Sequence, residues 1–185
     1  MKLERYRTHG GKRIIDIRVS SALQLFDARD PAPFRARDLD DDFVEYVTAA
    51  AEEIPGGGIE IAIHIDERPA VALDAQSIAE SIRAFFEYQI DLRRLQISKL
   101  FRTARLFLMI GFGCLILCLL AGELLEKMPS PSTFHRVLRE GIIIFGWVSL
   151  WKPFELLLFD WYPAYDRMKL LRRLAKCNIQ ISFKG

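Results

Sequence analysis

The feature that most constrains this chain is an uncharged apolar run at residues 106–122, LFLMIGFGCLILCLLAG, which Leu124 and Leu125 extend. A helix needs about twenty predominantly apolar residues to cross the hydrocarbon core of a bilayer. The run therefore predicts a transmembrane helix over residues 106–125. The rest of the chain has to be arranged around this helix, and the overall apolar content of 51% is consistent with a membrane protein.

A second apolar stretch covers residues 141–161 and carries Lys152, Pro153 and Glu155. It spans about 31 Å as a helix, which is long enough to cross the bilayer. The two stretches predict a transmembrane helical hairpin whose external loop covers residues 126–140. Charged residues inside a span are costly in lipid, so these three residues form a candidate intramembrane polar site.

The distribution of lysine and arginine predicts the orientation of the hairpin. Cations gather just before the first span and just after the second, and the connecting segment at residues 123–140 carries three cations offset by three glutamates. Because cytoplasmic loops carry the excess of Lys and Arg, both termini are expected in the cytoplasm. The same topology accounts for the cations, and the net charge is only +2, so nucleic acid is not an expected partner. The flanking cations are Arg93, Arg94, Lys99, Arg102 and Arg105, and then Arg167, Lys169, Arg172, Arg173 and Lys176.

Outside the spans, alternation of apolar and polar residues predicts a small α/β domain. Residues 15–19, 59–65 and 178–183 alternate with period two and are typical of half-buried strands. Between the first two, residues 39–54 have helical spacing, with aspartates in the first turn and Pro55-Gly56-Gly57-Gly58 as a turn at the end. Two strands alone are marginally stable, so we expect the C-terminal strand to join the others in one sheet. The fold class is thus membrane α+β, with one helix on a three-stranded sheet.

These patterns divide the chain into eight segments. A flexible N-terminus covers residues 1–12, and the cytoplasmic domain covers residues 13–73. The remaining segments are a connecting helix at 74–105, the spans and loop described above, a basic cytoplasmic helix at 162–177 and a strand at 178–185. Because no Gly or Pro interrupts residues 74–110, the connecting helix is expected to continue into the first span.

The connecting helix carries an apolar stripe of Ile78, Ile82, Phe86 and Ile90. The spacing is four residues and drifts from a clean heptad. Two interpretations are open: the stripe pairs with a helix of another chain, or it packs on the sheet of its own domain.

The hairpin also offers side chains suited to helix packing and to the membrane interface. Small residues let helices approach closely, and aromatic residues prefer the headgroup region. Lys152 and Glu155 lie on one helix face and could form an ion pair, while Pro153 should kink the helix and free a carbonyl. Either this pair lines a pathway, or Lys152 snorkels to the cytoplasmic edge while the pair holds neighbouring helices together. The candidates for packing are Gly111, Gly113, Cys114, Cys118, Trp147 and Trp151, and those for interface anchors are Trp161, Tyr162 and Tyr165.

A metal site and a catalytic site are both weakly indicated. Six aspartates, at positions 27, 30, 38, 40, 41 and 42, could supply oxygen ligands but lack the spacing of a calcium loop. Turn and helix-start roles explain them as well. His64 on a strand and His135 in the loop have no evident catalytic partner. We expect no cofactor, no metal, no catalytic residue and no enzymatic activity.

Two motifs suggest kinship. The segment FDARDPAPF at residues 26–34 with RDLD at 37–40, and later Gly146-Trp147 followed by Trp151, Pro153, Glu155, Asp160-Trp161 and Pro163, resemble a group of short bacterial inner-membrane proteins. The resemblance implies two transmembrane helices and a location in the bacterial inner membrane. It implies no activity.

Three classes of function remain open. The first is a non-enzymatic membrane scaffold or accessory subunit that forms homo-oligomers or docks on a larger membrane complex. The second is an oligomeric ion channel or transporter lined by the second span. The third is a metal-dependent enzyme that uses the aspartate-rich segment. Two spans are too few to enclose a pathway in one chain, which favours the first class.

Overall fold

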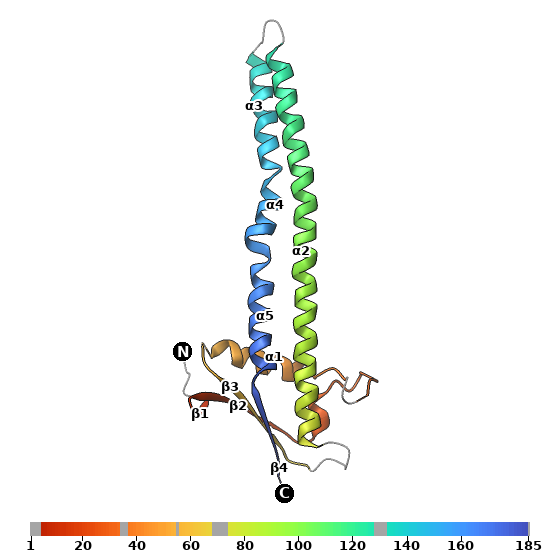
Figure 1. The fold of residues 1–185 in the computed structure, drawn as a ribbon, viewed down its shortest axis with the longest axis vertical. Helices are drawn as coiled ribbons and strands as arrows, with labels where there is room; N and C mark the ends of the chain where they lie inside the picture. The colour runs from red at the N-terminus through yellow and green to blue at the C-terminus, as the bar shows by residue number, and fades with distance from the viewer. Residues whose placement is uncertain (1–4, 34–36, 55, 68–73, 128–132, 185) are drawn as a thin grey trace. The chain divides into compact units, whose positions relative to one another are not determined.

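The computed structural model describes residues 5–33, 37–54, 56–67, 74–127 and 133–184 (Figure 1). The chain divides into two compact units. The first comprises residues 1–93 with 166–185, and the second, called the hairpin below, comprises residues 94–165. The first unit is discontinuous in sequence, because the whole hairpin is inserted between its two parts.

The first unit is built on a four-stranded mixed sheet in the order β1-β2-β3-β4. The strands are β1 (Arg7–His9), β2 (Lys12–Val19), β3 (Ile59–Ile65) and β4 (Asn178–Phe183). β2, β3 and β4 are mutually parallel, and β1 is antiparallel to β2. The prediction that the C-terminal strand joins the N-terminal strands is therefore confirmed.

The fourth strand, β1, lies inside the segment 1–12 that the sequence assigned to a flexible N-terminus. Gly10 and Gly11 have φ values of 57° and 76°, so they form the tight turn that a two-residue hairpin requires. Tyr6 is buried, and its hydroxyl donates to Glu53 Oε2 at 2.8 Å. The sheet consequently has four strands instead of the three expected.

Helix α1 (Asp41–Glu53) begins where the sequence predicts. The side chain of Asp40 accepts hydrogen bonds from the backbone N–H groups of Asp42 and Phe43, which caps the first turn. Phe43, Val47 and Ala51 point into the core of the first unit and are buried. Pro55, part of the predicted turn after this helix, lies outside the described residues. A short 3₁₀ helix, η2 (Ala22–Leu25), precedes α1.

The first part of the long helix α2 (Ala75–Glu126) also covers the core of the first unit. Its apolar stripe is buried within this single chain: Ile78, Ile82 and Phe86 are fully enclosed, and Ile90 nearly so. The four isoleucines of β3, which alternate with Glu60, Ala62 and His64, are buried as well. Of the two interpretations of the stripe, packing inside its own domain accounts for the burial.

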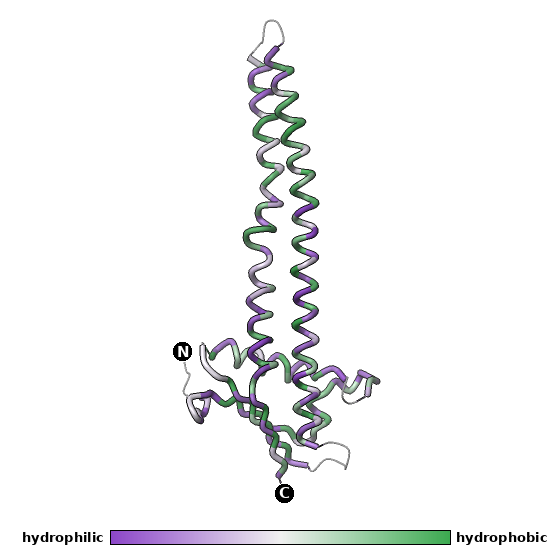
Figure 2. Tube along the Cα trace, in the orientation of Figure 1, coloured by the Kyte–Doolittle hydropathy of each residue, from purple (hydrophilic) through white to green (hydrophobic). Residues whose placement is uncertain are grey.

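The hairpin is formed by the second part of α2 and by α3 (Thr133–Val148), α4 (Trp151–Glu155), the π-helical turn η4 (Leu156–Asp160) and the start of α5 (Tyr162–Ala175). α2 continues without a break from the connecting segment into the predicted span, as expected. Two helical stretches, Ala75–Glu126 and Thr133–Ala175, are long and apolar enough to cross a membrane. Figure 2 shows the apolar residues gathered in the second half of α2 and in α3.

The loop predicted over residues 126–140 is shorter than expected, because α3 already begins at Thr133. The charged residues in this part of α3 are spaced by a helical turn, and an amphipathic helix can form in water as well as in lipid. Residues 128–132 of the predicted loop lie outside the described residues.

Candidate functional site

The α-helical hydrogen-bond pattern of the second arm changes just before Pro153. Proline has no N–H group, so the Ser149 carbonyl receives no helical hydrogen bond from that position. One turn earlier, the N–H of Leu150 donates to the Trp147 carbonyl at 3.1 Å instead of continuing the α-helical pattern. The α-helix is thus interrupted between Val148 and Trp151, the position at which Pro153 predicts a kink.

The Ser149 side chain offers a hydrogen bond at this interruption of the helix. Its hydroxyl lies 2.6 Å from the Gly146 carbonyl oxygen on its own helix and 3.1 Å from the Gly111 carbonyl oxygen on α2. A single hydroxyl hydrogen can serve either acceptor. Ser149 therefore links the two arms of the hairpin at the kink, a role that the sequence analysis missed.

A charged cluster follows the kink directly. Lys152 Nζ lies 3.0 Å from Glu155 Oε2 and 3.9 Å from Asp160 Oδ2. The first contact confirms that Lys152 and Glu155 pair on one helix face. Asp160 was not expected in this cluster, because the π-helical turn at Leu156–Asp160 changes the angular position that plain α-helical spacing would give it.

The three side chains of this cluster lie on the outside of the hairpin. Their exposed fractions are 57% for Lys152, 41% for Glu155 and 37% for Asp160. The cluster therefore does not line an interior cavity of a single hairpin. It is a surface feature of an otherwise apolar helix, and it carries two carboxylates for one ammonium group.

The small residues show which faces of the two arms meet. A Cβ atom added at Gly146 would lie 2.9 Å from Cys118 Cβ, and one added at Gly111 would lie 3.0 Å from the Ser149 carbonyl oxygen. Both glycines thus allow close approach inside the hairpin, as predicted for Gly111 and Cys118. Gly146 was missed as a packing residue. Gly113 is different, because a Cβ atom there would meet nothing within 4 Å.

The other predicted packing residues contribute less to the contact between the two arms of the hairpin. Cys114 is half-buried. The side chains of Trp147 and Trp151 point outward, with 62% and 74% of their surface exposed, so they do not pack between the two arms. Packing of these tryptophans against another helix stays a prediction that only a second chain could satisfy.

The predicted interface anchors form one aromatic cluster. The ring of Trp161 lies 6.2 Å from that of Tyr162 and 5.6 Å from that of Tyr165, and both contacts are edge-to-face. Phe101 on α2 contacts the same tryptophan at 6.5 Å. These rings gather at one level of the hairpin, which is the arrangement that an aromatic belt requires.

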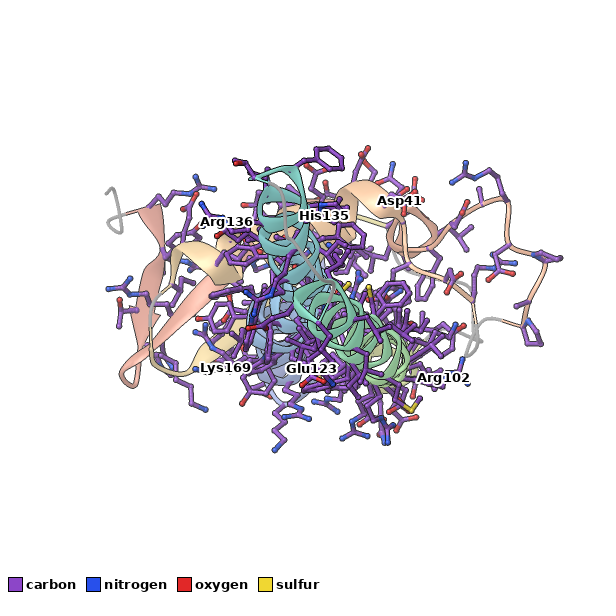
Figure 3. All side chains as sticks on the ribbon, turned by 90° about the horizontal axis from the view of Figure 1, so that it is seen from above. Asp41, Arg102, Glu123, His135, Arg136 and Lys169 are labelled. Atoms are coloured by element: carbon purple, nitrogen blue, oxygen red, sulfur yellow. The ribbon has the colours of Figure 1, made fainter. Side chains whose placement is uncertain are left out.

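The opposite end of the hairpin carries charges of both signs. Arg139 Nη2 on α3 donates to Glu126 Oε2 on α2 at 2.7 Å. Figure 3 looks down on this end and labels Glu123, His135 and Arg136 nearby. The ends of the apolar stretch are thus polar, whereas the cluster around Lys152 interrupts it.

Aspartates of the aspartate-rich segment bind neighbouring side chains and backbone N–H groups. Asp27 binds the guanidinium of Arg29, and Asp30 accepts hydrogen bonds from the backbone N–H groups of Ala32 and Asp38. These backbone donors hold the pKa of Asp30 below its ordinary value. Among the described residues, no three His, Cys, Asp or Glu side chains lie together as a metal ion would require. Asp27 and Asp30 thus hold turns, and Asp40 caps the first turn of α1.

A polar row crosses the sheet of the first unit. His64 Nδ1 on β3 lies 2.7 Å from Ser182 Oγ on β4, and His64 Nε2 lies 3.5 Å from Asp16 Oδ1 on β2. Asp16 also accepts a hydrogen bond from Arg7 Nε at 2.8 Å, which holds the pKa of Asp16 below its ordinary value. The sequence analysis missed this row, because Asp16 and Ser182 meet His64 only through the strand register.

The chemistry of this row resembles a proton relay, but its parts already serve as cross-strand links. Arg7 takes both carboxylate oxygens of Asp16, and the Ser182 hydroxyl also lies within 3.4 Å of the Ile63 carbonyl oxygen. A similar link stands beside it, where Gln180 Nε2 donates to the buried Glu60 at 2.9 Å. We read the row as the stabilising polar face of the sheet.

No known protein family, no curated protein and no solved structure matches this chain.

Proposed function

We propose that this chain is a non-enzymatic integral membrane scaffold or accessory subunit that self-associates through its hairpin. In this proposal the hairpin crosses the inner membrane of a bacterium, and both termini lie in the cytoplasm. The chain would belong with the short two-span inner-membrane proteins that its motifs resemble. The first unit would be the part that other cytoplasmic components contact.

Exposed apolar surface supports the membrane location. Only 17% of the most apolar window of α2 and 22% of that in Thr133–Ala175 is buried within the chain. A core helix of a soluble protein would be mostly covered by its own fold. Lipid is the environment in which such faces are stable without further protein contacts.

The observation that carries the self-association proposal is the position of the Lys152 cluster. Lys152, Glu155 and Asp160 are partly exposed on the outside of a single hairpin, in the second half of the predicted span at residues 141–161. Ionised groups facing lipid are expensive, so they are stable where they meet other protein groups. A second copy of the hairpin would cover the cluster, and the exposed Trp151 beside it would supply apolar contact area.

An ion channel is the second candidate, and the same cluster favours it. The facing surfaces of the two arms are closed by glycine, cysteine and leucine contacts, so a single hairpin offers no path for ions. A ring of hairpins could place the cluster around a shared lumen. With two carboxylates for each lysine, such a lumen would favour cations.

The test is the oligomeric state of four proteins in lipid nanodiscs: wild type, Lys152→Met, Glu155→Leu, and a triple variant with Lys152→Met, Glu155→Leu and Asp160→Leu. Removing Lys152 alone leaves two unpaired carboxylates, so we expect it to reduce assembly the most. The triple variant should recover assembly, because no unpaired charge remains. Ion flux in liposomes separates the candidates. If the protein is a channel, the wild-type protein conducts ions and the triple variant conducts with changed selectivity. If it is a scaffold, neither protein conducts.

The matched control is Arg139→Met, which breaks the ion pair with Glu126 at the end of the hairpin. This pair is exposed and near the predicted aqueous boundary, so its loss should leave assembly unchanged. A monomeric wild type, or equal assembly in all variants, would reject self-association through the cluster. The orientation is tested by reporter fusions at both ends of the chain, which should both report cytoplasm.

A further inference from the structure

A cavity of about 430 Å³ lies in the first unit, on the side where α5 meets the sheet. Three separate segments form it: the start of β2, the glycine loop before β3, and the last two turns of α5 with the residues that follow. The sequence predicts a turn at the glycine loop, and the cations of the basic helix indicate membrane topology. The fold brings the two together, although more than a hundred residues separate them.

The cavity lining is strongly basic. It includes five cationic side chains and no carboxylate. The cations are Lys12, Lys169, Arg172, Arg173 and Lys176. Like charges gathered this closely repel one another, so the arrangement is most stable when an anion is present.

The cations have few partners of their own. Arg173 donates to the backbone carbonyl oxygens of Ala51 and Ile54, at 3.4 Å and 2.9 Å, and so helps to end α1. Arg172 reaches only the weak acceptor Met168 Sδ, at 3.5 Å, among the residues that the structure describes. Within those same residues, Lys12, Lys169 and Lys176 form no ion pair. The ammonium groups of these lysines can therefore turn toward a ligand.

The glycine loop allows the Lys12 side chain to lie close to the backbone. Gly57 has a φ of 141°, a conformation that residues with a side chain rarely adopt. A Cβ atom added at Gly58 would lie 2.6 Å from Lys12 Cγ. The absence of that Cβ atom lets the Lys12 stem lie against the loop, and Lys12 lines the cavity. Gly58 is thus needed for the position of Lys12.

We propose that this cavity binds an anion that carries phosphate groups. Phosphate offers several charged oxygen acceptors, which suits a set of lysine and arginine donors from three segments. The thiol of Cys177, which also lines the cavity, is neutral because burial raises its pKa to about 11, so it does not oppose an anion. The anion could be the headgroup of an acidic lipid or a soluble polyphosphate, and both share this chemistry.

The reaction rate of Cys177 with iodoacetamide reports occupancy, because the buried thiol reacts only when the surrounding structure unfolds locally, and a ligand that binds the folded cavity makes this unfolding rarer. The full chain is placed in phosphatidylcholine nanodiscs, with and without inorganic pyrophosphate at constant ionic strength. A second set of nanodiscs contains phosphatidate and no pyrophosphate. Peptide mass spectrometry then separates Cys177 from the two cysteines of the hairpin. We expect modification to slow about tenfold when the ligand is at ten times its Kd.

Protection by pyrophosphate identifies a soluble phosphate ligand, and protection by phosphatidate alone identifies a lipid headgroup. Lys12→Gln keeps most of the stem but removes the charge, so it should raise the pyrophosphate concentration needed for protection about tenfold. Lys12→Arg should restore binding. The matched control, Lys184→Gln, removes an exposed lysine of the same unit outside the cavity and should have no effect. The proposal is overturned if neither anion protects Cys177, if sodium chloride protects equally, or if Lys12→Gln and Lys184→Gln behave alike.

Discussion

Gly146 is the position where a single methyl group tests the packing of the hairpin most directly. In Gly146→Ala the new Cβ atom would lie 2.9 Å from Cys118 Cβ, 3.0 Å from Leu115 Cδ1 and 3.4 Å from Leu115 Cα. The leucine methyl group can move, because it is the end of a flexible side chain. The other two atoms are fixed to the backbone of α2, so the two arms must separate locally.

The expected change in the unfolding free energy of Gly146→Ala is the sum of two opposing effects. Overpacking a close contact costs about 1–3 kcal/mol. Replacing glycine by alanine inside a helix gains about 0.5–1 kcal/mol. Gly113→Ala is the matched control, since its added Cβ atom meets nothing within 4 Å. This variant therefore gains helix stability without the cost of overpacking. The helix gain cancels in the comparison, so Gly146→Ala should be less stable than Gly113→Ala by about 1–3 kcal/mol.

The assay is unfolding of the full chain in mixed micelles with an increasing fraction of denaturing detergent, followed by tryptophan fluorescence of the hairpin. Cys118→Gly removes the fixed atom nearest to the new methyl group. Combining it with Gly146→Ala should therefore recover part of the loss, beyond the sum of the two single effects. Equal stability of Gly146→Ala and Gly113→Ala would refute the close contact of the two arms at this level.

Two further predictions concern the first unit. Burial raises the pKa of Cys177 from 9.0 to about 11. Without ligand, the thiolate fraction of Cys177 at neutral pH should therefore be about a hundredfold below that of an exposed thiol. Alkylation of Cys177 at the rate of a free thiol would contradict this burial. The guanidinium of Arg7 holds the pKa of Asp16 below its ordinary value of 3.8, so this carboxylate stabilises the fold fully above that pH, and the contribution is lost as pH falls through the lower folded-state pKa. Arg7→Leu should remove most of this contribution, and urea unfolding at several acidic pH values should show a weaker pH dependence for the variant than for wild type.

The sequence predicted those elements whose apolar spacing is long and regular. Alternation at Ile59–Ile65 gave the central strand, and the same alternation near the C-terminus gave β4. The stripe from Ile78 to Ile90 indicated a helix but not what covers it, because spacing alone does not distinguish a partner chain from the domain itself. Burial in the folded chain decides that question.

The missed features depend on contacts between distant residues or on short local signals. β1 has no apolar residue among its three, so only the Gly10-Gly11 turn could have indicated it. The link between Asp16, His64 and Ser182 follows from the register of parallel strands, which the alternation pattern does not contain. Asp160 joined the Lys152 cluster through a π-helical turn, and the sequence has no plain signal for such a turn.

The discontinuity of the first unit has a consequence for how the protein is made. β4 is translated only after the whole of the hairpin, yet it pairs with β3 from the first part of the chain. During synthesis one side of β3 therefore stays unpaired until the ribosome has delivered both the hairpin and β4. If the hairpin crosses a membrane twice as proposed, a molecule whose second span failed to insert would leave β4 on the other side of the bilayer from β3. The sheet would then be completed only in molecules that have inserted both spans, so that the folded domain would itself report correct insertion.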